Sequence, residues 1–569
     1  SVVGALEKLA RKSTSPLGRL HALYTLDGLR ALRPEIVLEA LRDSDARVRE
    51  HAIRLSELFL AGLNGAASDR PSDHGGRDTA SPPLSRLDGV SRRAVERMKS
   101  GLFSLSGDPD ERIRFQLALT LGAMESGDAI ALLGRLAEGS RLDHWQALAI
   151  LSSVGSRPAA LFVELARSGN PRWETLSSDD DVRFLEALGA VIGASAEEDN
   201  RALLYQMTLM GYETTNRLYR LPLLAGAAGG MGRTGRSLNQ FIRNPPEPAR
   251  YQAGSVDSLI KLANETARSN EAPLRFRLPA IRILANLETT VGGKVLLELL
   301  LPGPSHEVES AAVAAVAELN DPILARGAFA NWTRRSRSVR QQVVGSAARS
   351  PAIAAALLEA LDQGEVARIE VDASTRQALL KAHNAELRQR AEALFDNPAV
   401  TDRAEVLRKF QSCLQLEGDR GRGATIFART CLMCHAMQGR GNAVGPNIYS
   451  VASQPKETLL ASILDPSRQV TPDYLSYTVT TADGETLTGL IVSESATTVT
   501  LRRQNVPDAT LQRNRIKEIN AEGKSLMPDG LEEGLTPQDI ADLLTFVRQP
   551  EATLLPKENE NASKTNPAQ

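Results

Sequence analysis

The chain has 569 residues, a mass of 61.4 kDa and a formal net charge of −2 at pH 7. This length is too great for one hydrophobic core, so we expect two or more domains. Hydrophobic residues make up 42% and charged residues 24%, as in an ordinary globular protein. The near-neutral charge gives no general reason to expect nucleic acid or an anionic membrane as a partner. No run of 18 or more apolar residues is present, so no transmembrane segment is predicted.

Residues 1–410 read as short amphipathic helices joined by small polar turns. One pattern recurs there: a polar turn, then Val, Ile or Leu with Arg close by, then an Ala-rich apolar helix. It is clearest over residues 45–55 and 110–119, with later copies near residues 273, 307, 338 and 386. These segments resemble HEAT repeats, whose paired helices stack into a solenoid. We expect the Asp residues to cap helices and the Arg residues to bridge neighbouring repeats, in a scaffold without a catalytic site.

Three stretches interrupt or decorate this pattern. Residues 66–91, rich in Ser, Asp, Gly, Pro and Arg, predict a mobile loop inside the solenoid. Residues 230–235 match G-x-G-x-x-G, but no strand precedes them, so a repeat turn is favoured over a dinucleotide site. Asp179, Asp180 and Asp181 indicate a helix cap rather than a metal site.

A basic cluster follows, made of Arg334, Arg335, Arg337 and Arg340. Its ordinary interpretation is a solvated repeat turn, and the alternative is a docking site for an acidic partner.

The composition turns polar and glycine-rich over residues 411–422, which predicts a linker. A helix over residues 423–430 then leads into Cys431-Leu432-Met433-Cys434-His435. Cys-x-x-Cys-His is the attachment signature of a c-type haem. The two thiols add to the vinyl groups of one porphyrin, and the histidine supplies a nitrogen ligand to the iron. We therefore expect one covalently attached haem c, held by Cys431 and Cys434 with His435 on the metal.

A structural zinc site is the alternative for this motif, and it would need a second pair of Cys or His ligands nearby. The nearest other histidines, His383 and His306, lie far upstream. The third cysteine, Cys413, is left unpaired. We predict a small residue on a helix face, with an intermolecular disulfide or a reactive thiol as the alternatives.

Two further residues are expected to support the haem. In small c-type cytochromes a Gly-Pro at the position of Gly445 and Pro446 lets the proline carbonyl accept the imidazole proton. We assign this role to Pro446, with turn formation as the alternative. Phe427 lies one helical turn before Cys431, where its ring fits the haem edge or, equally well, an ordinary core.

The sixth iron ligand is predicted to be Met527. The other methionine downstream of the motif, Met437, is two residues from His435 and cannot reach the opposite face of the haem. Met527 lies in a loop before a helix that Thr536 and Pro537 open, where soluble cytochromes place their methionine. A buried filler residue is the alternative.

Between His435 and Met527 the period changes to that of strands. A small antiparallel β insertion is predicted over about residues 474–519, within a haem domain of residues 423–549. Asp483-Gly484 indicates the first hairpin turn. The predicted strands are 474–481, 485–493 and 497–503, with a further strand from 510–512 and 516–519. The tail, residues 550–569, is predicted to be disordered.

Residues from about 421 to 548 resemble the c-type haem-binding domain of the Pirellula/Verrucomicrobium type. The resemblance rests on the Cys-x-x-Cys-His motif and on Val444-Gly445-Pro446-Asn447, Ile463-Leu464-Asp465-Pro466, Tyr477-Thr478-Val479, Leu487-Thr488-Gly489 and Ser525-Leu526-Met527-Pro528-Asp529-Gly530-Leu531. It implies a bacterial envelope redox protein. In that family HEAT-like repeats commonly precede the haem domain, and a sugar-dehydrogenase-like propeller, which this sequence lacks, often lies further upstream.

The predicted fold is therefore mainly α: a HEAT-like α-solenoid, then a cytochrome c-like helical domain with a small β insertion. The leading hypothesis is a single-haem electron-transfer protein whose solenoid holds a redox partner, either a dehydrogenase donor or a cytochrome or oxidase acceptor. One alternative is the electron exit of a sugar or alcohol dehydrogenase whose catalytic part lies on missing sequence or another subunit. Another is a haem sensor or ligand-binding scaffold. Because this haem is attached outside the cytoplasm and the chain opens without Met, we expect a mature product or fragment in the periplasm or cell envelope.

Overall fold

The computed structural model describes residues 2–60, 89–124, 127–139, 142–209, 217–247, 256–287, 289–303, 305–395, 403–468, 470–503, 506–550 and 555. They form two compact units, Ser1–Leu287 and Glu288–Gln569, each considered by itself here. The predicted mobile loop at 66–91 lies outside the described residues up to residue 88, and so does most of the predicted tail, 550–569. No helix in the described part of the chain is long and apolar enough to span a bilayer.

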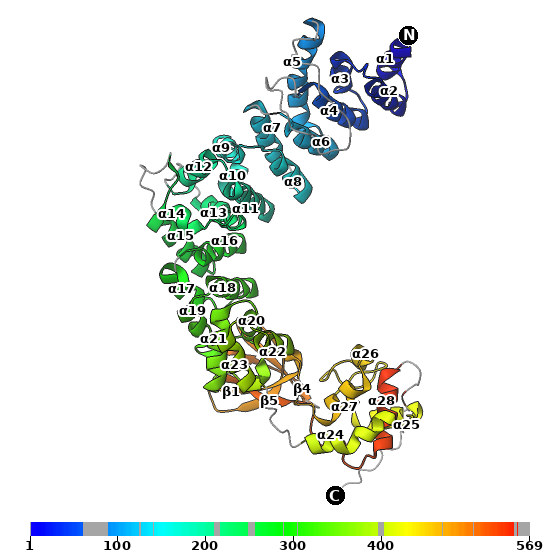
Figure 1. Ribbon diagram of the computed structural model, residues 1–569, viewed down its shortest axis with the longest axis vertical. Coiled ribbons are helices and arrows are strands. Elements are labelled where there is room, and N and C mark those ends of the chain that lie inside the picture. Colours follow the sequence, from blue (N-terminus) through cyan, green and yellow to red (C-terminus); the bar gives the residue numbers. More distant parts are fainter. Residues whose placement is uncertain are drawn as a thin grey trace. The chain divides into compact units, whose positions relative to one another are not determined.

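The first unit is built from helices throughout its described residues (Figure 1). Each helix packs on a neighbour in the chain or on a helix two or three places along, which gives stacked pairs. The α-helices are α1 (Val2–Lys12), α2 (Pro16–Gly28), α3 (Pro34–Ala40), α4 (Ala46–Leu60), α5 (Gly89–Ser104), α6 (Glu111–Leu121), α7 (Gly127–Ala137), α8 (His144–Ser152), α9 (Pro158–Arg167), α10 (Pro171–Thr175), α11 (Asp179–Ala194), α12 (Glu198–Leu209), α13 (Arg220–Arg233), α14 (Leu238–Arg243), α15 (Val256–Arg268) and α16 (Leu274–Ala285).

The recurring Asp and Arg residues make the expected contacts. The carboxylate of Asp110 accepts a hydrogen bond from the Arg112 backbone N–H at 3.0 Å and so caps α6. Arg19 of α2 pairs with Asp43 at 2.6 Å, and Arg49 of α4 reaches Asp108 at 2.9 Å. These arginines bridge successive helical pairs, which is why the pattern recurs.

The Gly-rich segment 230–235 spans the end of α13 and the turn after it, so the nucleotide-site alternative has no structural support. Gly230 serves helix packing instead. A Cβ atom on Gly230 would lie 2.1 Å from the Ala190 carbonyl oxygen of α11, so only glycine allows this approach. The three aspartates 179–181 form the first turn of α11, as predicted, behind the N-cap Ser178.

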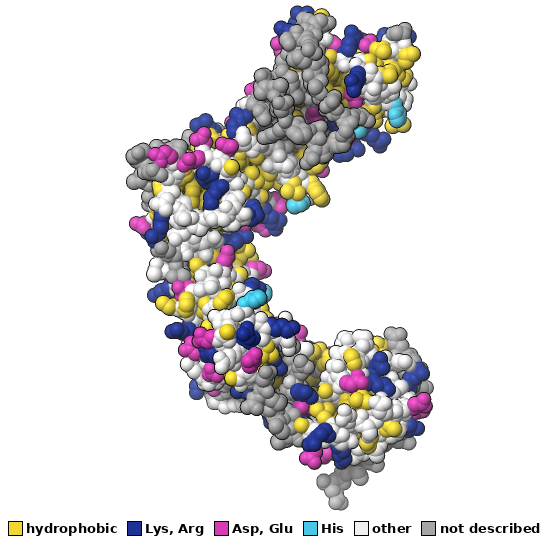
Figure 2. All heavy atoms as spheres, in the orientation of Figure 1, with side chains coloured by type: hydrophobic (Ala, Val, Ile, Leu, Met, Phe, Trp, Pro, Cys, Tyr) yellow, Lys and Arg dark blue, Asp and Glu magenta, His cyan; other side chains and the backbone are white. Residues whose placement is uncertain are grey.

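The second unit begins with further stacked helices and continues, after α25, through two short helices and a sheet to α28 (Figure 1). Its α-helices are α17 (Thr289–Glu298), α18 (His306–Leu319), α19 (Pro322–Phe329), α20 (Arg337–Ser346), α21 (Pro351–Asp362), α22 (Ala373–Leu380), α23 (Ala385–Phe395), α24 (Ala404–Phe410), α25 (Arg420–Thr430), α26 (Ile448–Val451), α27 (Lys456–Leu464) and α28 (Pro537–Arg548). Lys, Arg, Asp and Glu side chains are interspersed on the face of the molecule drawn in Figure 2.

A five-stranded antiparallel sheet lies between α27 and α28 in the chain, with strand order β4-β3-β2-β1-β5. The first three predicted strands are confirmed to within one residue. In place of one further strand there are two. The strands are β1 (Leu475–Thr481), β2 (Thr486–Glu494), β3 (Thr498–Arg503), β4 (Val506–Gln512) and β5 (Ile516–Ser525). Gly484 makes the predicted first turn with a φ of 86°. The predicted fold class is confirmed.

The sheet covers part of the basic cluster, so the prediction of a solvated turn is wrong for most of it. Arg335 and Arg340 are 2% and 1% exposed, and only Arg334 of the four is exposed. Burial lowers the pKa of Arg335 to about 10. The Arg340 guanidinium lies 3.7 Å from the Glu370 carboxylate and stacks over Tyr477 of β1. The sequence around Arg340 did not reveal its burial, because the strands that pack on it, β1 and β5, come more than a hundred residues later.

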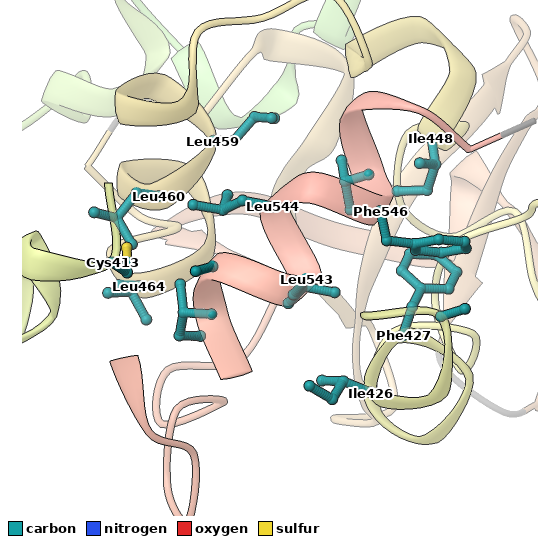
Figure 3. Close-up of a cluster of buried hydrophobic side chains, with 14 of the residues drawn as sticks. Cys413, Ile426, Phe427, Ile448, Leu459, Leu460, Leu464, Leu543, Leu544 and Phe546 are labelled. Atoms are coloured by element: carbon teal, nitrogen blue, oxygen red, sulfur yellow. The ribbon is translucent and has the colours of Figure 1, made fainter. Parts of the chain in front are cut away.

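The helices around the Cys-x-x-Cys-His motif have their own core, drawn in Figure 3. Phe427 of α25 packs on Phe546 of α28, with ring centroids 5.5 Å apart. Phe410 and Cys413, predicted at the end of the solenoid and in a linker, are buried in this core. Burial raises the pKa of the Cys413 thiol, which supports a packing role over a reactive one. The predicted boundaries at 410 and 422 remain predictions.

Candidate haem-binding site

Helix α25 carries the Cys-x-x-Cys-His motif at its carboxyl end. Asp419 caps the helix by accepting a hydrogen bond from the Arg422 N–H at 2.8 Å. At the other end the Cys431 N–H donates to the Phe427 carbonyl at 2.8 Å, and the His435 N–H donates to the Cys431 carbonyl at 3.0 Å. The motif therefore continues the helix as one tight turn, and the two cysteines lie on that turn three positions apart.

The His435 ring is held by the loop that follows it. Its Nδ1 lies 2.8 Å from the carbonyl oxygen of Pro446. A carbonyl can only accept, so Nδ1 carries the proton, and in the neutral ring Nε2 keeps its lone pair. The Gly445 backbone packs on the ring: a Cβ there would lie 2.5 Å from His435 Cε1. The loop fixes the tautomer that a metal ligand needs.

One cavity of about 410 Å³ lies against the motif. It is lined by Cys431, Cys434 and His435 of the motif and by Met527 from the loop after β5. Among the described residues that line it, none is Asp, Glu, Lys or Arg. The other lining residues are Phe427, Val444, Gly445, Pro446, Ile448, Ser450, Val451, Gln454, Leu459, Ser462, Ile463, Pro466, Val470, Thr471, Tyr474, Leu490, Ser525, Leu526, Leu543 and Val547.

The apolar walls set the protonation states of the motif. Burial, with a smaller effect of the neighbouring Cys434, raises the pKa of Cys431 to about 12. Burial also raises the pKa of Cys434. The pKa of His435 is lowered, because burial outweighs the opposing hydrogen bond to the Pro446 carbonyl. Neutral thiols and a neutral imidazole therefore face the cavity.

The two methionines downstream of the motif have different surroundings. Met527 lies at the cavity wall, half-buried, and its N–H donates to the Ser525 hydroxyl at 3.1 Å. Met437 is 1% exposed, belongs to the helical core and does not line the cavity. Of the two, only Met527 shares a cavity with His435.

The geometry also bears on the zinc alternative. Cys431, Cys434 and His435 do not form a group placed to hold one metal ion, and no such group of three His, Cys, Asp or Glu exists among the described residues.

Residues 421–485 match the family model for cytochrome c. The match supports a c-type haem-binding domain. It covers the motif, the Pro446 loop, α27 and the first strand, and leaves the repeats and Met527 outside. No curated protein matches the chain significantly.

Similar solved structures are distant. An engineered protein is 17% identical, with a TM-score of 0.25, and the match covers 69% of this chain and 93% of that one. Kap95p, whose binding induces the switch loops of RanGDP to adopt the GTP-bound conformation, is 12% identical with a TM-score of 0.33. The match covers 73% of this chain and 58% of that one. Importin beta is 13% identical with a TM-score of 0.33 over 75% and 54%. The chain spans little more than half of these last two, and such scores assign no repeat type.

The cytochrome c domain fits a haem by the chemistry of its donors. It offers two thiols for covalent attachment, an imidazole with a free Nε2, a thioether, and a cavity with largely apolar walls. The glycine at position 445 leaves room for the imidazole that a side chain would displace. Phe427, 1% exposed, adds an aromatic wall and belongs to the core at the same time.

Sequence reasoning missed the far wall of the cavity in the cytochrome c domain. Tyr474 precedes β1, and Leu490 lies on β2. Neither residue belongs to a sequence motif that indicates haem binding. Ile463, Pro466 and Leu526 also line the cavity, and they belong to the segments on which the family resemblance rests. That resemblance was the only signal in the sequence that could have found part of this wall.

Proposed function

We propose that the chain is a single-haem c-type cytochrome that transfers electrons. Cys431 and Cys434 would form thioether bonds to the porphyrin, and His435 and Met527 would be the iron ligands. Pro446 orients the imidazole, and Phe427 would pack at the haem edge. The observation that carries the proposal is that His435 and Met527, distant in sequence, line one cavity beside both cysteines.

The chemistry follows from the two ligands. A haem held by an imidazole and a thioether exchanges one electron at a raised potential and leaves no open position for a substrate. The chain contributes orientation through the Nδ1–H hydrogen bond to Pro446. It also contributes exclusion of water, since Leu490 and Leu543 in the wall are each 3% exposed. Both effects favour fast, reversible electron transfer over oxygen chemistry.

We further infer that the repeats hold this domain near a redox partner outside the cytoplasmic membrane. The partner is a dehydrogenase donor or a cytochrome or oxidase acceptor. The inference is supported by the packing of the sheet on the repeats, where the Arg340 guanidinium stacks over the Tyr477 ring. Stopped-flow mixing of the reduced full-length protein with redox proteins of the same cell envelope measures the rate of electron transfer between them. Electron exchange with none of them would contradict the inference.

The sharpest test of the function replaces Met527. The protein, made with the haem-attachment machinery, is expected to gain the mass of one haem and to show a methionine–iron band when oxidised. Met527→Ala should keep the haem mass but lose the band. Its reduction potential should fall by on the order of 0.1 V, within the roughly 0.8 V that axial ligands span.

Met433→Ala is the matched control, because Met433 lies between the two cysteines but is 51% exposed and does not line the cavity. The control should keep both the band and the potential. A band that persists in Met527→Ala would refute the ligand assignment. Rapid binding of carbon monoxide by the reduced wild-type protein would favour the sensor alternative.

A further inference from the structure

We propose that Arg337, a residue of the repeats, is a positioning residue for the haem cavity. The inference rests on the proposed function, since it concerns the same cavity. Arg337 is the first residue of α20, behind the N-cap Ser336, and its side chain is 15% exposed. It holds two segments, at Asp473 and Ile491, whose neighbouring residues line the cavity.

The guanidinium of Arg337 spans two segments of the haem region. Nη1 donates to the Ile491 carbonyl of β2 at 2.8 Å, and Nη2 pairs with the Asp473 carboxylate, just before β1. The next residue on the first segment is Tyr474, and the residue before Ile491 is Leu490. Both of these neighbours line the cavity. One side chain of the repeats thus sets the spacing of two parts of the far wall.

The restraint that Arg337 imposes extends through the sheet to the loop of Met527. Leu475, two residues after Asp473, pairs with Ser525 at the end of β5. The Ser525 N–H donates to the Ser467 hydroxyl at 3.1 Å, and the Ser525 hydroxyl accepts from the Met527 N–H at 3.1 Å. A shift of the segment that Arg337 holds is therefore passed to the backbone that presents Met527.

The two contacts of Arg337 are unequal. Asp473 is 80% exposed, so its ion pair is well solvated and contributes little by itself. Ile491 is 2% exposed, so its carbonyl would lose a partner that water cannot readily replace. A planar guanidinium can serve both acceptors at once, which a lysine ammonium does less well. The backbone N–H of Arg337 also donates to Glu494 at 2.7 Å, and this bond survives any substitution other than proline.

The test compares Arg337→Met with wild type in the full-length haem protein. Amide hydrogen exchange over residues 473–475, 490–492 and 525–527 should become about tenfold faster, because each segment loses a restraint. The methionine–iron band should weaken and the potential should fall, because water gains access to the haem. Arg337→Lys, which keeps the charge, should recover part of the potential and less of the protection. Asp473→Asn should change all three readouts only slightly.

Arg19→Met is the matched control. Like Arg337, Arg19 serves a carboxylate and a backbone carbonyl: it pairs with Asp43 at 2.6 Å and donates to the Ser13 carbonyl at 2.7 Å, but in the first unit. It should leave the exchange of the three segments and the band unchanged. Unchanged exchange in Arg337→Met would overturn the proposal, and so would faster exchange with an unaltered band and potential, since the role would then be structural only.

The failure of the proposed function is distinguishable from the failure of this inference. Wild-type protein that carries no haem mass would refute the cytochrome assignment. The exchange comparison in that haem-free chain still decides whether Arg337 restrains the two wall segments, because it needs no haem.

Discussion

At the residue scale, the orientation of His435 depends on the absence of a side chain at Gly445, whose backbone packs on the imidazole ring. Gly445 has no side chain, and its backbone N–H donates to the Cys434 carbonyl at 2.7 Å, which pulls the loop against the motif. The imidazole fills the space that a Cβ would take. The Pro446 carbonyl then meets Nδ1. The histidine is thus fixed by packing and by one hydrogen bond.

Gly445→Ala should therefore displace the ring. A Cβ 2.5 Å from Cε1 must push the imidazole or the loop away, and such overpacking costs about 1–3 kcal/mol. We expect a lower yield of attached haem and a lower urea midpoint, followed by haem absorbance. Gly345→Ala is the control, because a Cβ there meets nothing within 4 Å. Wild-type yield and midpoint in Gly445→Ala would contradict the close packing.

At the element scale, the haem region depends on the pairing of α25 with α28. Asp542 of α28 is fully buried and accepts from the Asp419 N–H at 2.6 Å and from Arg422 Nε at 2.6 Å. The helix that presents the motif is thereby tied at its first turn to the helix after the Met527 loop. The Thr536 capping box starts α28 at the position predicted from the sequence.

Asp542 makes this pairing pH-dependent. Burial opposes ionisation, but hydrogen bonds from Arg422, the Asp419 N–H and Gln538 outweigh it and hold the pKa of Asp542 below its usual range. A depressed carboxyl pKa stabilises the folded state above the unfolded pKa, near 4, and this contribution disappears as pH falls through the folded value. Asp542→Asn should lower the free energy of unfolding by about 2 kcal/mol at neutral pH.

The measurement is urea unfolding from pH 7 down to below 4. The difference between wild type and Asp542→Asn should shrink at the acid end. Asp529→Asn, at an exposed carboxyl in the loop before α28, should show little difference at any pH. A difference that is the same at pH 7 and below 4 would show that Asp542 acts through packing rather than charge.

At the scale of the whole molecule, the sheet joins the haem region to the repeats inside the second unit. Trp332 Nε1 donates to the Glu370 carboxylate at 3.0 Å, and Arg340 lies between that carboxylate and Tyr477 of the sheet. Arg340 Nη1 also approaches the Ile519 carbonyl of β5 at 3.4 Å. The sheet therefore packs directly on the repeats through a buried charge.

Glu370→Ala tests the packing of the sheet on the repeats. It leaves the Arg340 charge buried without its partner, and breaking a buried pair in this way costs about 3–5 kcal/mol. Thermal unfolding followed by haem absorbance should shift to lower temperature. Asp362→Ala removes the more exposed pair with Arg390 and should change stability by less than about 1 kcal/mol. Equal effects of the two substitutions would mean that the buried pair contributes no more than a surface one.

The sequence by itself determined what depends on short spacing. It gave the Cys-x-x-Cys-His turn, the caps and bridges of the helical pairs, the start of α28 and the first three strands, because helix and strand periods are read within a few residues. Met527 could be proposed as the sixth iron ligand by elimination. The family match over residues 421–485 agrees with the haem attachment signature.

Only the tertiary structure decided which distant segments meet. Arg337 and Arg340 look like parts of a solvated turn until β1, β2 and β5 cover them. Cys413 and Gly230 acquire their roles from partners on other helices. Tyr474 and Leu490 become cavity walls through strand pairing. Contacts over such separations are set by burial of whole surfaces, and no local pattern in the chain records which surface will cover which.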